Sequence, residues 1–148
     1  MKTEVEIKKL NDNAIIPTYG TEFSAGADIY ALIDGNTVTI APGETKMIGT
    51  GLAFAIPEGL VGLIVARSSL GTKRGLAPAN KVGVIDSDYR GEVRVVLHNH
   101  SSQPQTVENG ERIAQILFVP YYSADFKLCD ELSATSRGAG GFGSTGNK

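Results

Sequence analysis

Three short polar segments carry side chains that could act on a phosphorylated ligand. The first is Arg67-Ser68-Ser69, which follows the apolar run Leu60–Ala66. A guanidinium, two hydroxyls and the unpaired backbone N–H groups at the start of a short helix together form an anion-binding site. The alternative is a helix that Ser68 or Ser69 caps, with Arg67 facing solvent. These residues alone leave both interpretations open.

The second segment places a carboxylate, Asp86, between an apolar arm at Val82–Ile85 and the alternating run Glu92–His98. Two β-type arms around a polar turn predict a β-hairpin. A carboxylate at such a strand end can serve as a general base. Taken alone, the segment favours the commoner role of Asp at a strand end, which is to cap the turn.

The third carboxylate, Asp28, lies among small and apolar residues in Ser24–Tyr30. Mg²⁺ prefers oxygen ligands and retains several waters, so Asp28 could bind it directly or through water. A buried Asp with a structural role is an equal alternative.

Two other features lack the partners that a site requires. His98 and His100 share a strand face, but no cysteine or third ligand lies nearby to complete a zinc site. Cys129 is the only cysteine, which excludes an intrachain disulfide, fits a reducing cytosol and suggests an inert thiol. The sequence also contains neither a phosphate-binding P-loop nor a Gly-x-Ser-x-Gly elbow, which removes two large enzyme classes.

The elements that must position these residues are short β-type segments separated by Gly/Pro turns, with no long amphipathic helix. One helical turn is expected from Ser68 or Ser69 to Lys73, ended by Gly75. The apolar run Leu60–Ala66 is expected to be buried on both faces. Many short strands at this spacing predict an all-β sandwich or barrel. The expected strands are Val5–Lys8, Thr37–Ile40, Lys46–Ile48, Leu52–Ile56, Leu60–Ala66, Val82–Ile85, Glu92–His98 and Ile113–Val119.

Composition places the chain among ordinary single-domain proteins. It has 148 residues, 41% hydrophobic and 20% charged, with a net charge of −2. This charge gives no basic footprint for nucleic acid. The longest apolar run is too short to span a bilayer, and the start lacks the apolar stretch of a signal peptide. We therefore expect a cytoplasmic protein with neither nucleic acid nor membrane as partner.

The last sixteen residues, 133–148, differ in composition from the rest and include five glycines. One interpretation is a disordered tail. The single Arg137 and single Phe142 set in glycine are instead typical of a flap that orders on a ligand, with Arg on phosphates and Phe over a base. We predict a folded domain at 1–132 and a flexible flap at 133–148.

In this order and spacing the segments resemble the five motifs of the trimeric dUTPase family, and the resemblance covers nearly the whole chain. The hairpin and the tail match almost literally. The five segments are Ala25–Ile29, Pro57–Gly75, Gly83–Glu92 preceded by Asn80, Gly110–Gln115 and Arg137–Gly146.

The resemblance implies a distorted, jelly-roll-like β-barrel that forms a three-fold homotrimer with active sites shared between subunits. It implies hydrolysis of dUTP to dUMP and diphosphate with Mg²⁺, which supplies dUMP for thymidylate synthesis and keeps uracil out of DNA. It makes Asp86 the base that activates water for attack on the α-phosphorus, and it reverses the turn-capping and disordered-tail interpretations.

The resemblance also assigns binding roles. Asn80 and main-chain groups of Gly83, Val84 and Ile85 would pair with uracil, and the Tyr89 ring would exclude a 2′-hydroxyl. Arg67, Ser68, Ser69 and Gln115 would hold the phosphates. Asp28 would reach Mg²⁺ through water, while the phosphates supply most of its ligands. Phe142 would cover the base, and Arg137, Ser144 and Thr145 would contact the terminal phosphates. For Arg94 we expect a main-chain contact and no side-chain role.

Two rival functions fit parts of the same pattern. A dCTP deaminase shares the fold and a similar Arg-Ser-Ser segment, but the hairpin around Asp86 and the Phe142 tail favour a dUTPase. A nucleotide-sensing, partner-binding protein without catalysis would have lost Asp86 or the tail, and both are present.

Overall fold

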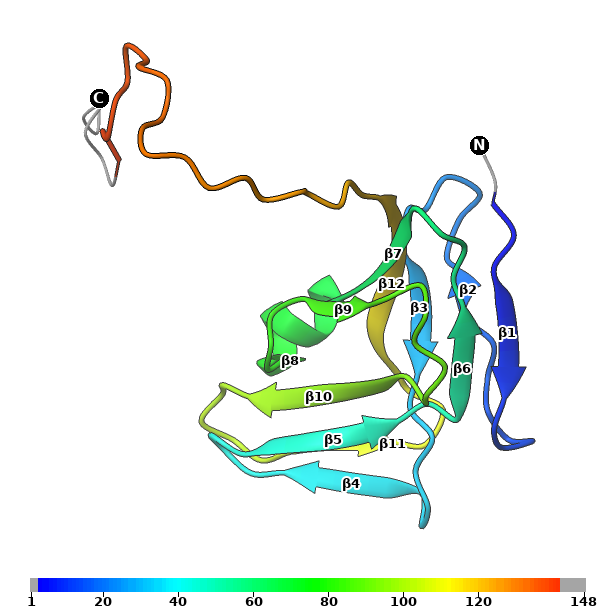
Figure 1. The fold of residues 1–148 in the computed structure, drawn as a ribbon. Helices are drawn as coiled ribbons and strands as arrows, with labels where there is room; N and C mark the ends of the chain where they lie inside the picture. Colours follow the sequence, from blue (N-terminus) through cyan, green and yellow to red (C-terminus); the bar gives the residue numbers. More distant parts are fainter. Residues whose placement is uncertain (1–2, 142–148) are drawn as a thin grey trace.

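The computed structural model describes residues 3–141, and the regular secondary structure in this range consists of short β-strands and one short helical turn (Figure 1). The all-β prediction is therefore confirmed. The strands are β1 (Glu6–Lys9), β2 (Thr18–Tyr19), β3 (Ala27–Tyr30), β4 (Thr37–Ile40), β5 (Thr45–Gly49), β6 (Leu52–Ala55), β7 (Leu60–Val65), β8 (Leu76–Pro78), β9 (Gly83–Ile85), β10 (Arg94–Asn99), β11 (Gln105–Glu108) and β12 (Arg112–Pro120).

The ladders form four separately hydrogen-bonded sheets in the described chain, and they do not join into one closed barrel. The largest sheet has the order β2-β3-β12-β7-β9, and a three-stranded sheet has the order β5-β10-β8. The pairs β1-β6 and β11-β4 complete the body. In Figure 1 the β4, β5, β10 and β11 strands run across the direction of β3, β6, β7 and β12. Apolar side chains from both groups of strands fill the space between them, including Ile29, Leu52, Leu97 and Ile116.

The expected strands are all present with small shifts, and four more were missed. The missed strands are Thr18–Tyr19, Ala27–Tyr30, Leu76–Pro78 and Gln105–Glu108. Two of them lack the usual sequence signal of a strand: Leu76–Pro78 contains a proline, and Gln105–Glu108 is mostly polar. The other two are only two and four residues long. Such segments become strands because a neighbouring strand has unpaired backbone groups at its edge. The residue pattern of the segment itself does not show this.

The two arms around Asp86 were predicted to pair as a β-hairpin. This prediction is wrong, because the arms pair with other strands. β9 pairs with β7, whereas β10 pairs with β5 and β8. Between them the Val93 N–H donates to the Leu52 carbonyl at 2.8 Å, which draws the chain into the second group of strands. The segment from Asp86 to Gly91 is therefore a turn that connects two sheets.

The expectation that Leu60–Ala66 is buried on both faces is also wrong for the single chain. Gly62 and Ile64 are buried, but Val61, Leu63 and Val65 on the opposite face are only half-buried, and Ala66 is exposed. The paired Leu117 on β12 is half-buried as well. One face of the β7–β12 pair is thus apolar and only partly covered.

The chain leaves the body after β12 and extends away from it (Figure 1). Residues 121–141 contain no strand or helix. The division at residue 132 into a domain and a flap remains a prediction, since the last strand already ends at Pro120. None of the helical turns in the described part of the chain has the length and apolar character needed to traverse a lipid bilayer.

Candidate active site

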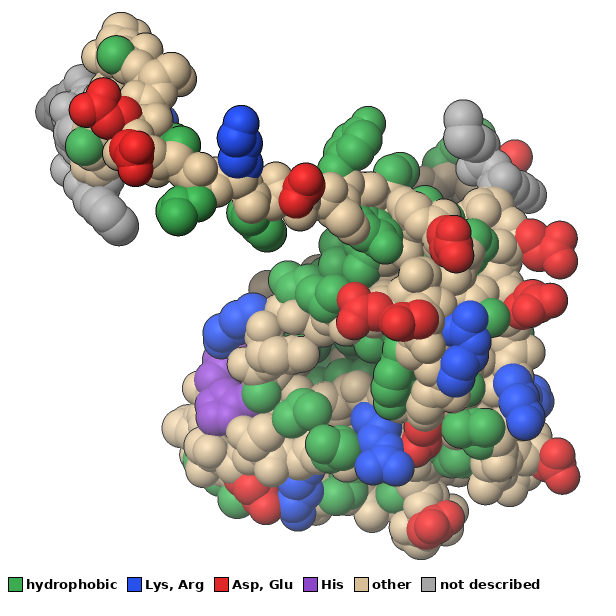
Figure 2. Space-filling model, viewed as in Figure 1, with side chains coloured by type: hydrophobic (Ala, Val, Ile, Leu, Met, Phe, Trp, Pro, Cys, Tyr) green, Lys and Arg blue, Asp and Glu red, His purple; other side chains and the backbone are tan. Residues whose placement is uncertain are grey.

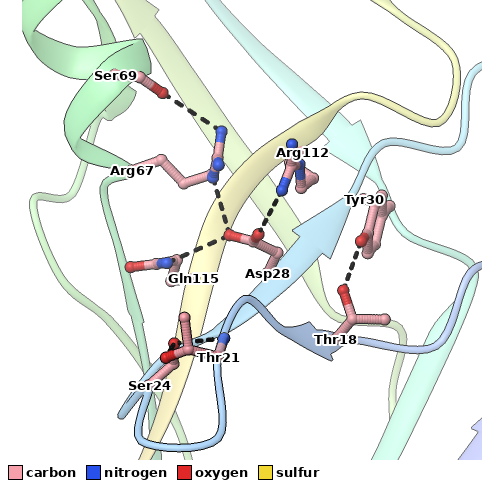
Figure 3. Close-up of polar contacts among 9 residues, drawn as sticks. All are labelled: Thr18, Thr21, Ser24, Asp28, Tyr30, Arg67, Ser69, Arg112 and Gln115. Atoms are coloured by element: carbon pink, nitrogen blue, oxygen red, sulfur yellow. Dashed lines mark hydrogen bonds and ion pairs between the residues drawn. The ribbon is translucent and has the colours of Figure 1, made fainter.

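The Asp28 carboxylate lies at the centre of a charged network on the outer face of the five-stranded sheet (Figure 3). Strand β3 carries Asp28 directly opposite Gln115 on β12. Oδ1 accepts a hydrogen bond from Arg67 Nε at 2.8 Å and one from Gln115 Nε2 at 3.2 Å. Oδ2 accepts one from Arg112 Nη1 at 3.2 Å. Three of the residues expected at the phosphates or the metal, Asp28, Arg67 and Gln115, therefore meet in one network, together with an arginine that was not expected.

Arg112 is that unexpected member of the site, and an irregularity in β12 explains why pattern reasoning missed it. Residues three apart on a regular strand point to opposite faces. The register between β12 and β3 shifts between Arg112 and Ala114, so that Arg112 lies opposite Tyr30 while Gln115 lies opposite Asp28. This bulge brings Arg112 and Gln115 to the same face. The motif spacing carries no signal of the bulge.

The Arg67-Ser68-Ser69 segment follows β7 and leads into a short π-helical turn, η1 (Leu70–Arg74). Gly75 ends this turn in a left-handed conformation at φ 66°, as predicted. Ser69 makes no side-chain capping hydrogen bond, and Arg67 pairs with the buried Asp28 and does not simply face solvent, so the structure does not support the capped-helix alternative. Because η1 has only five residues, its helix dipole contributes little to anion binding. Binding of an anion at this segment must therefore depend on the side chains.

Those side chains line a cavity of about 300 Å³ that is strongly basic. Arg67 Nη1 lies 3.4 Å from Ser69 Oγ, and both residues face this cavity. Arg112, Lys73 and Arg74 line it as well, with Glu111 as the only acidic residue. A concave surface with this excess of guanidinium and ammonium groups suits a polyanion such as a phosphate chain.

A second cavity, of about 400 Å³, lies beside Asp86. Asp86 follows β9 directly, and its side chain is exposed. Within residues 3–141 the carboxylate accepts no hydrogen bond, and the turn is closed instead by its main-chain carbonyl, which accepts from the Tyr89 N–H at 3.2 Å. The turn-capping interpretation of the carboxylate is therefore not supported. Apolar side chains, including Val84, Ile85 and Val96, form much of the cavity wall.

The Tyr89 ring forms another part of this wall and is held in place. Its hydroxyl donates to the Glu92 carbonyl at 3.0 Å. A Cβ atom on Gly91 would overlap the phenol, so the glycine makes room for the ring. Arg94 also lines the cavity with its side chain, and Nε donates to Glu92 Oε2 at 2.7 Å. The expectation of a main-chain contact and no side-chain role for Arg94 stays a prediction, although its side chain borders the cavity.

Glu92 connects Arg94 to the turn between β5 and β6, which contains Gly51. Burial alone would raise the pKa of the Glu92 carboxyl, but the Gly51 N–H and the Arg94 guanidinium bind the ionised form and lower the pKa below its usual value. The Gly51 N–H donates to Oε1 at 2.9 Å. A side chain on Gly49 would come within 2.8 Å of the same oxygen, so this position needs glycine. The carboxylate is therefore ionised at neutral pH and holds Arg94 at the cavity edge.

Replacing Glu92 by Gln should lower the free energy of unfolding at pH 7 by about 1 kcal/mol, because Arg94 is partly exposed and its pairing is screened. A lowered native pKa contributes stability above the pKa of the unfolded state, and this contribution is lost as pH falls through the native value. The difference between wild type and variant should therefore shrink on acidification to about pH 3. Urea denaturation at both pH values measures it. The exposed Glu22→Gln serves as the control, and a difference independent of pH would contradict the assignment.

The remaining predicted residues in the described part of the chain line neither of these two cavities. Asn80 is exposed on the turn before β9, with its amide close to the buried Gly83. Ser68 is exposed, and its carbonyl accepts from Thr72 Oγ1 at 2.6 Å. Arg137 Nε donates to the Gly140 carbonyl at 2.9 Å within the extended segment. Phe142, Ser144 and Thr145 lie outside the described residues.

The two cavities share no lining residue, although one nucleotide would need both kinds of surface. The first suits phosphates, and the second suits a flat, largely apolar group next to a free carboxylate. Together they define the class: an all-β protein with a basic cavity and a separate, largely apolar cavity that borders a free carboxylate.

Comparison with known proteins specifies the family. The dUTPase family model matches residues 12–146. The deoxyuridine 5′-triphosphate nucleotidohydrolase of Shewanella oneidensis is 46% identical over 153 residues, and the alignment covers 100% of both chains. The enzyme of the same name from Shewanella sp. strain ANA-3 is 47% identical with the same coverage. The chain belongs to the dUTPase family.

Solved structures agree with this assignment. A mutant dUTPase of Staphylococcus bacteriophage 80alpha with dUpNHpp has a TM-score of 0.88 and 29% sequence identity, covering 98% of this chain and 99% of its own. A mutant dUTPase from phage phi11 of S. aureus, described with a structural Mg(II) ion, has a TM-score of 0.76 and 25% identity, covering 87% of this chain and 98% of its own. The prediction of the dUTPase fold is therefore confirmed.

Proposed function

We propose that this protein is a dUTP diphosphatase that hydrolyses dUTP to dUMP and diphosphate through attack of water on the α-phosphorus. The observation that carries the mechanism is the Asp86 carboxylate, exposed and free of hydrogen bonds within residues 3–141, at the edge of the cavity walled by Val84, Ile85 and Tyr89. A free carboxylate beside a nucleoside-sized cavity is suited to orient and deprotonate a water molecule. The family supports the choice of substrate.

The nucleoside would occupy the Asp86 cavity. Main-chain groups of Gly83, Val84 and Ile85, with the Asn80 amide, would pair with the polar edge of uracil. β9 has β7 as its only partner strand among the described elements, so its other edge is available for such pairing. Cytosine would leave these polar groups of the protein unpaired. The cost of unpaired polar groups discriminates against cytosine more strongly than packing alone.

The phosphates would occupy the basic cavity, held by Arg67, Ser68, Ser69 and Gln115. Phosphoryl transfer depends chiefly on positioning and charge neutralisation, which guanidiniums and hydroxyls supply. Arg137, Phe142, Ser144 and Thr145 of the tail would close over the nucleotide, with Phe142 on the base and the other three on the terminal phosphates.

Mg²⁺ fits this site as an ion that the substrate carries. Among the described residues no group of three or more His, Cys, Asp or Glu side chains is placed to hold a metal. A magnesium ion bound mainly by phosphates needs no such group, since it retains several waters and takes few protein ligands. Asp28 is the carboxylate that could contact its water shell. When bound, Mg²⁺ would neutralise the phosphate chain and withdraw charge from the reacting phosphorus.

We also propose that three chains assemble around a three-fold axis, with each site shared between subunits. Two surfaces of the single chain support this. One is the half-covered apolar face of β7 and β12. The other is the extended segment after Pro120, where Tyr122, Phe126 and Leu128 are 100%, 93% and 97% exposed. Figure 2 shows hydrophobic side chains projecting along this outstretched segment. Side chains of this size need a neighbouring surface to cover them.

Product analysis on dUTP, UTP, dCTP and dTTP tests the function. We expect diphosphate and the monophosphate from dUTP, with far less from the other three. Release of ammonia from dCTP would instead identify a deaminase. Tight binding of dUTP without turnover would identify a nucleotide-sensing protein.

Tyr89→Ala should reduce the preference for dUTP over UTP. The ring lines the cavity, so its removal opens space where a 2′-hydroxyl would lie, and the gain should appear mainly as increased kcat/KM for UTP. A change of about 10-fold in the ratio is expected for one lost steric contact. Tyr89→Phe is the control, because it keeps the ring and loses only the hydrogen bond to the Glu92 carbonyl. An equal loss of activity on both nucleotides would mean that Tyr89 only supports the turn.

A further inference from the structure

The environment of Asp28 indicates a second role beside contact with the water shell of the metal. Its side chain is only 5% exposed and is surrounded by donors from two separate segments (Figure 3). Arg67 lies after β7, while Arg112 and Gln115 lie on β12. Two of the three donors are guanidiniums, so the carboxylate is outnumbered by positive charge.

This arrangement ties the carboxylate mainly to its neighbouring donors. A carboxylate offers about four lone-pair positions, and three of them are filled by the contacts of 2.8, 3.2 and 3.2 Å. The two guanidiniums and one carboxylate have a net positive charge. The same charges favour a phosphate oxygen.

The contacts instead fix the orientation of the two arginines. Arg67 uses Nε for Asp28, which directs its terminal nitrogens toward Ser69 and the basic cavity. Arg112 uses Nη1 for Asp28 and lines the same cavity, although its side chain is 51% exposed. A planar guanidinium held at one nitrogen loses little further freedom when it binds a phosphate through the others.

We propose that Asp28 is a positioning residue for the phosphate chain, acting through Arg67 and Arg112, and that Arg112 is a further phosphate-binding residue. This inference rests on the proposed function, because it takes the basic cavity as the place of the substrate's phosphates. It assigns to Asp28 an effect on phosphate binding that passes through the arginines and does not require the magnesium ion.

The test measures binding of the imido analogue dUpNHpp and of dUMP to the wild type and Asp28→Asn, each in EDTA and in Mg²⁺. Loss of a charged partner in a buried hydrogen-bonded group should weaken analogue binding about 10-fold or more. The loss should already be present in EDTA, where no metal contact contributes, and it should be smaller for dUMP, which carries one phosphate. A loss confined to Mg²⁺ would assign Asp28 to the metal and overturn the proposal, as would unchanged analogue binding.

Arg112→Gln gives a second test that does not depend on the folding of Asp28→Asn. It leaves the Asp28–Arg67 pair in place and alters a half-exposed side chain, so the fold should be retained, as circular dichroism can verify. We expect weaker analogue binding in both media, with little change for dUMP. Lys8→Gln is the matched control, because it removes one positive charge from an exposed position on β1, away from both cavities. Equal binding by Arg112→Gln and Lys8→Gln would overturn the assignment of Arg112.

Failure of the inference and failure of the proposed function are distinguishable. If the wild type neither binds dUpNHpp nor hydrolyses dUTP, the function is wrong. If the wild type does both while the two variants bind as it does, only the inference is wrong.

Discussion

Asp86→Asn should lower the turnover of dUTP about 10²-fold or more while nucleotide affinity changes little. Asn has nearly the volume of Asp and retains an oxygen that can contact the sugar, but it cannot accept a proton from water. The carboxylate is exposed and makes no hydrogen bond in the part of the chain that the structure describes, so its replacement should not disturb the fold. Single-turnover kinetics and equilibrium binding of dUpNHpp measure the two effects separately.

Asp88→Asn is the matched control for this substitution. Asp88 is exposed on the same turn and borders a third cavity together with Asp86, but it does not line the cavity beside β9, so its variant should retain normal turnover. If both variants kept normal turnover, the base would lie elsewhere. If both lost it equally, the effect would reflect the charge of the turn and not a specific base.

Deleting Arg137–Lys148 should produce an effect of similar size, on the order of 10²-fold or more, because it removes phosphate donors and the cover that excludes water. The folded body should survive, since the last strand ends at Pro120 and residues 121–140 of the described chain are mostly exposed. Substrate should still bind to the body. Thermal denaturation, dUpNHpp binding and turnover test the three statements, and unchanged turnover would restore the disordered-tail interpretation.

Mixing the two inactive chains tests whether base and tail come from different subunits. When Asp86→Asn and the truncated chain are refolded together in equal amounts, a site of a cyclic trimer receives an intact base with probability one half and an intact tail with the same probability. About a quarter of the sites should therefore recover activity. If the base and tail of each site belonged to the same chain, no ratio of the two variants would restore turnover.

The sequence shows where the polar segments of the candidate site lie, but it does not show how the strands that carry them pair. Asp86 lies where the polarity changes from an apolar arm to a turn, and that boundary is visible in the sequence. The pairing of the two arms is not visible, because β9 and β10 find their partners in strands far away along the chain. Pairing depends on the edges that the folded body presents, which local pattern does not encode.

The same limit explains the residues that were missed. Arg112 reaches Asp28 only because a bulge turns it to the face of Gln115. Arg94 lines the second cavity only because Glu92, anchored by the Gly51 N–H, holds its guanidinium there. Both depend on contacts with segments remote in sequence, whereas Gly75 was predicted to end the helical turn from its own conformational freedom.

The most direct test of the central claim is hydrolysis of dUTP in water enriched in ¹⁸O, followed by mass spectrometry of the products. If water activated by Asp86 attacks the α-phosphorus, the label should appear in dUMP, and the diphosphate should carry none. Label in the diphosphate would place the attack on the β-phosphorus and contradict the account.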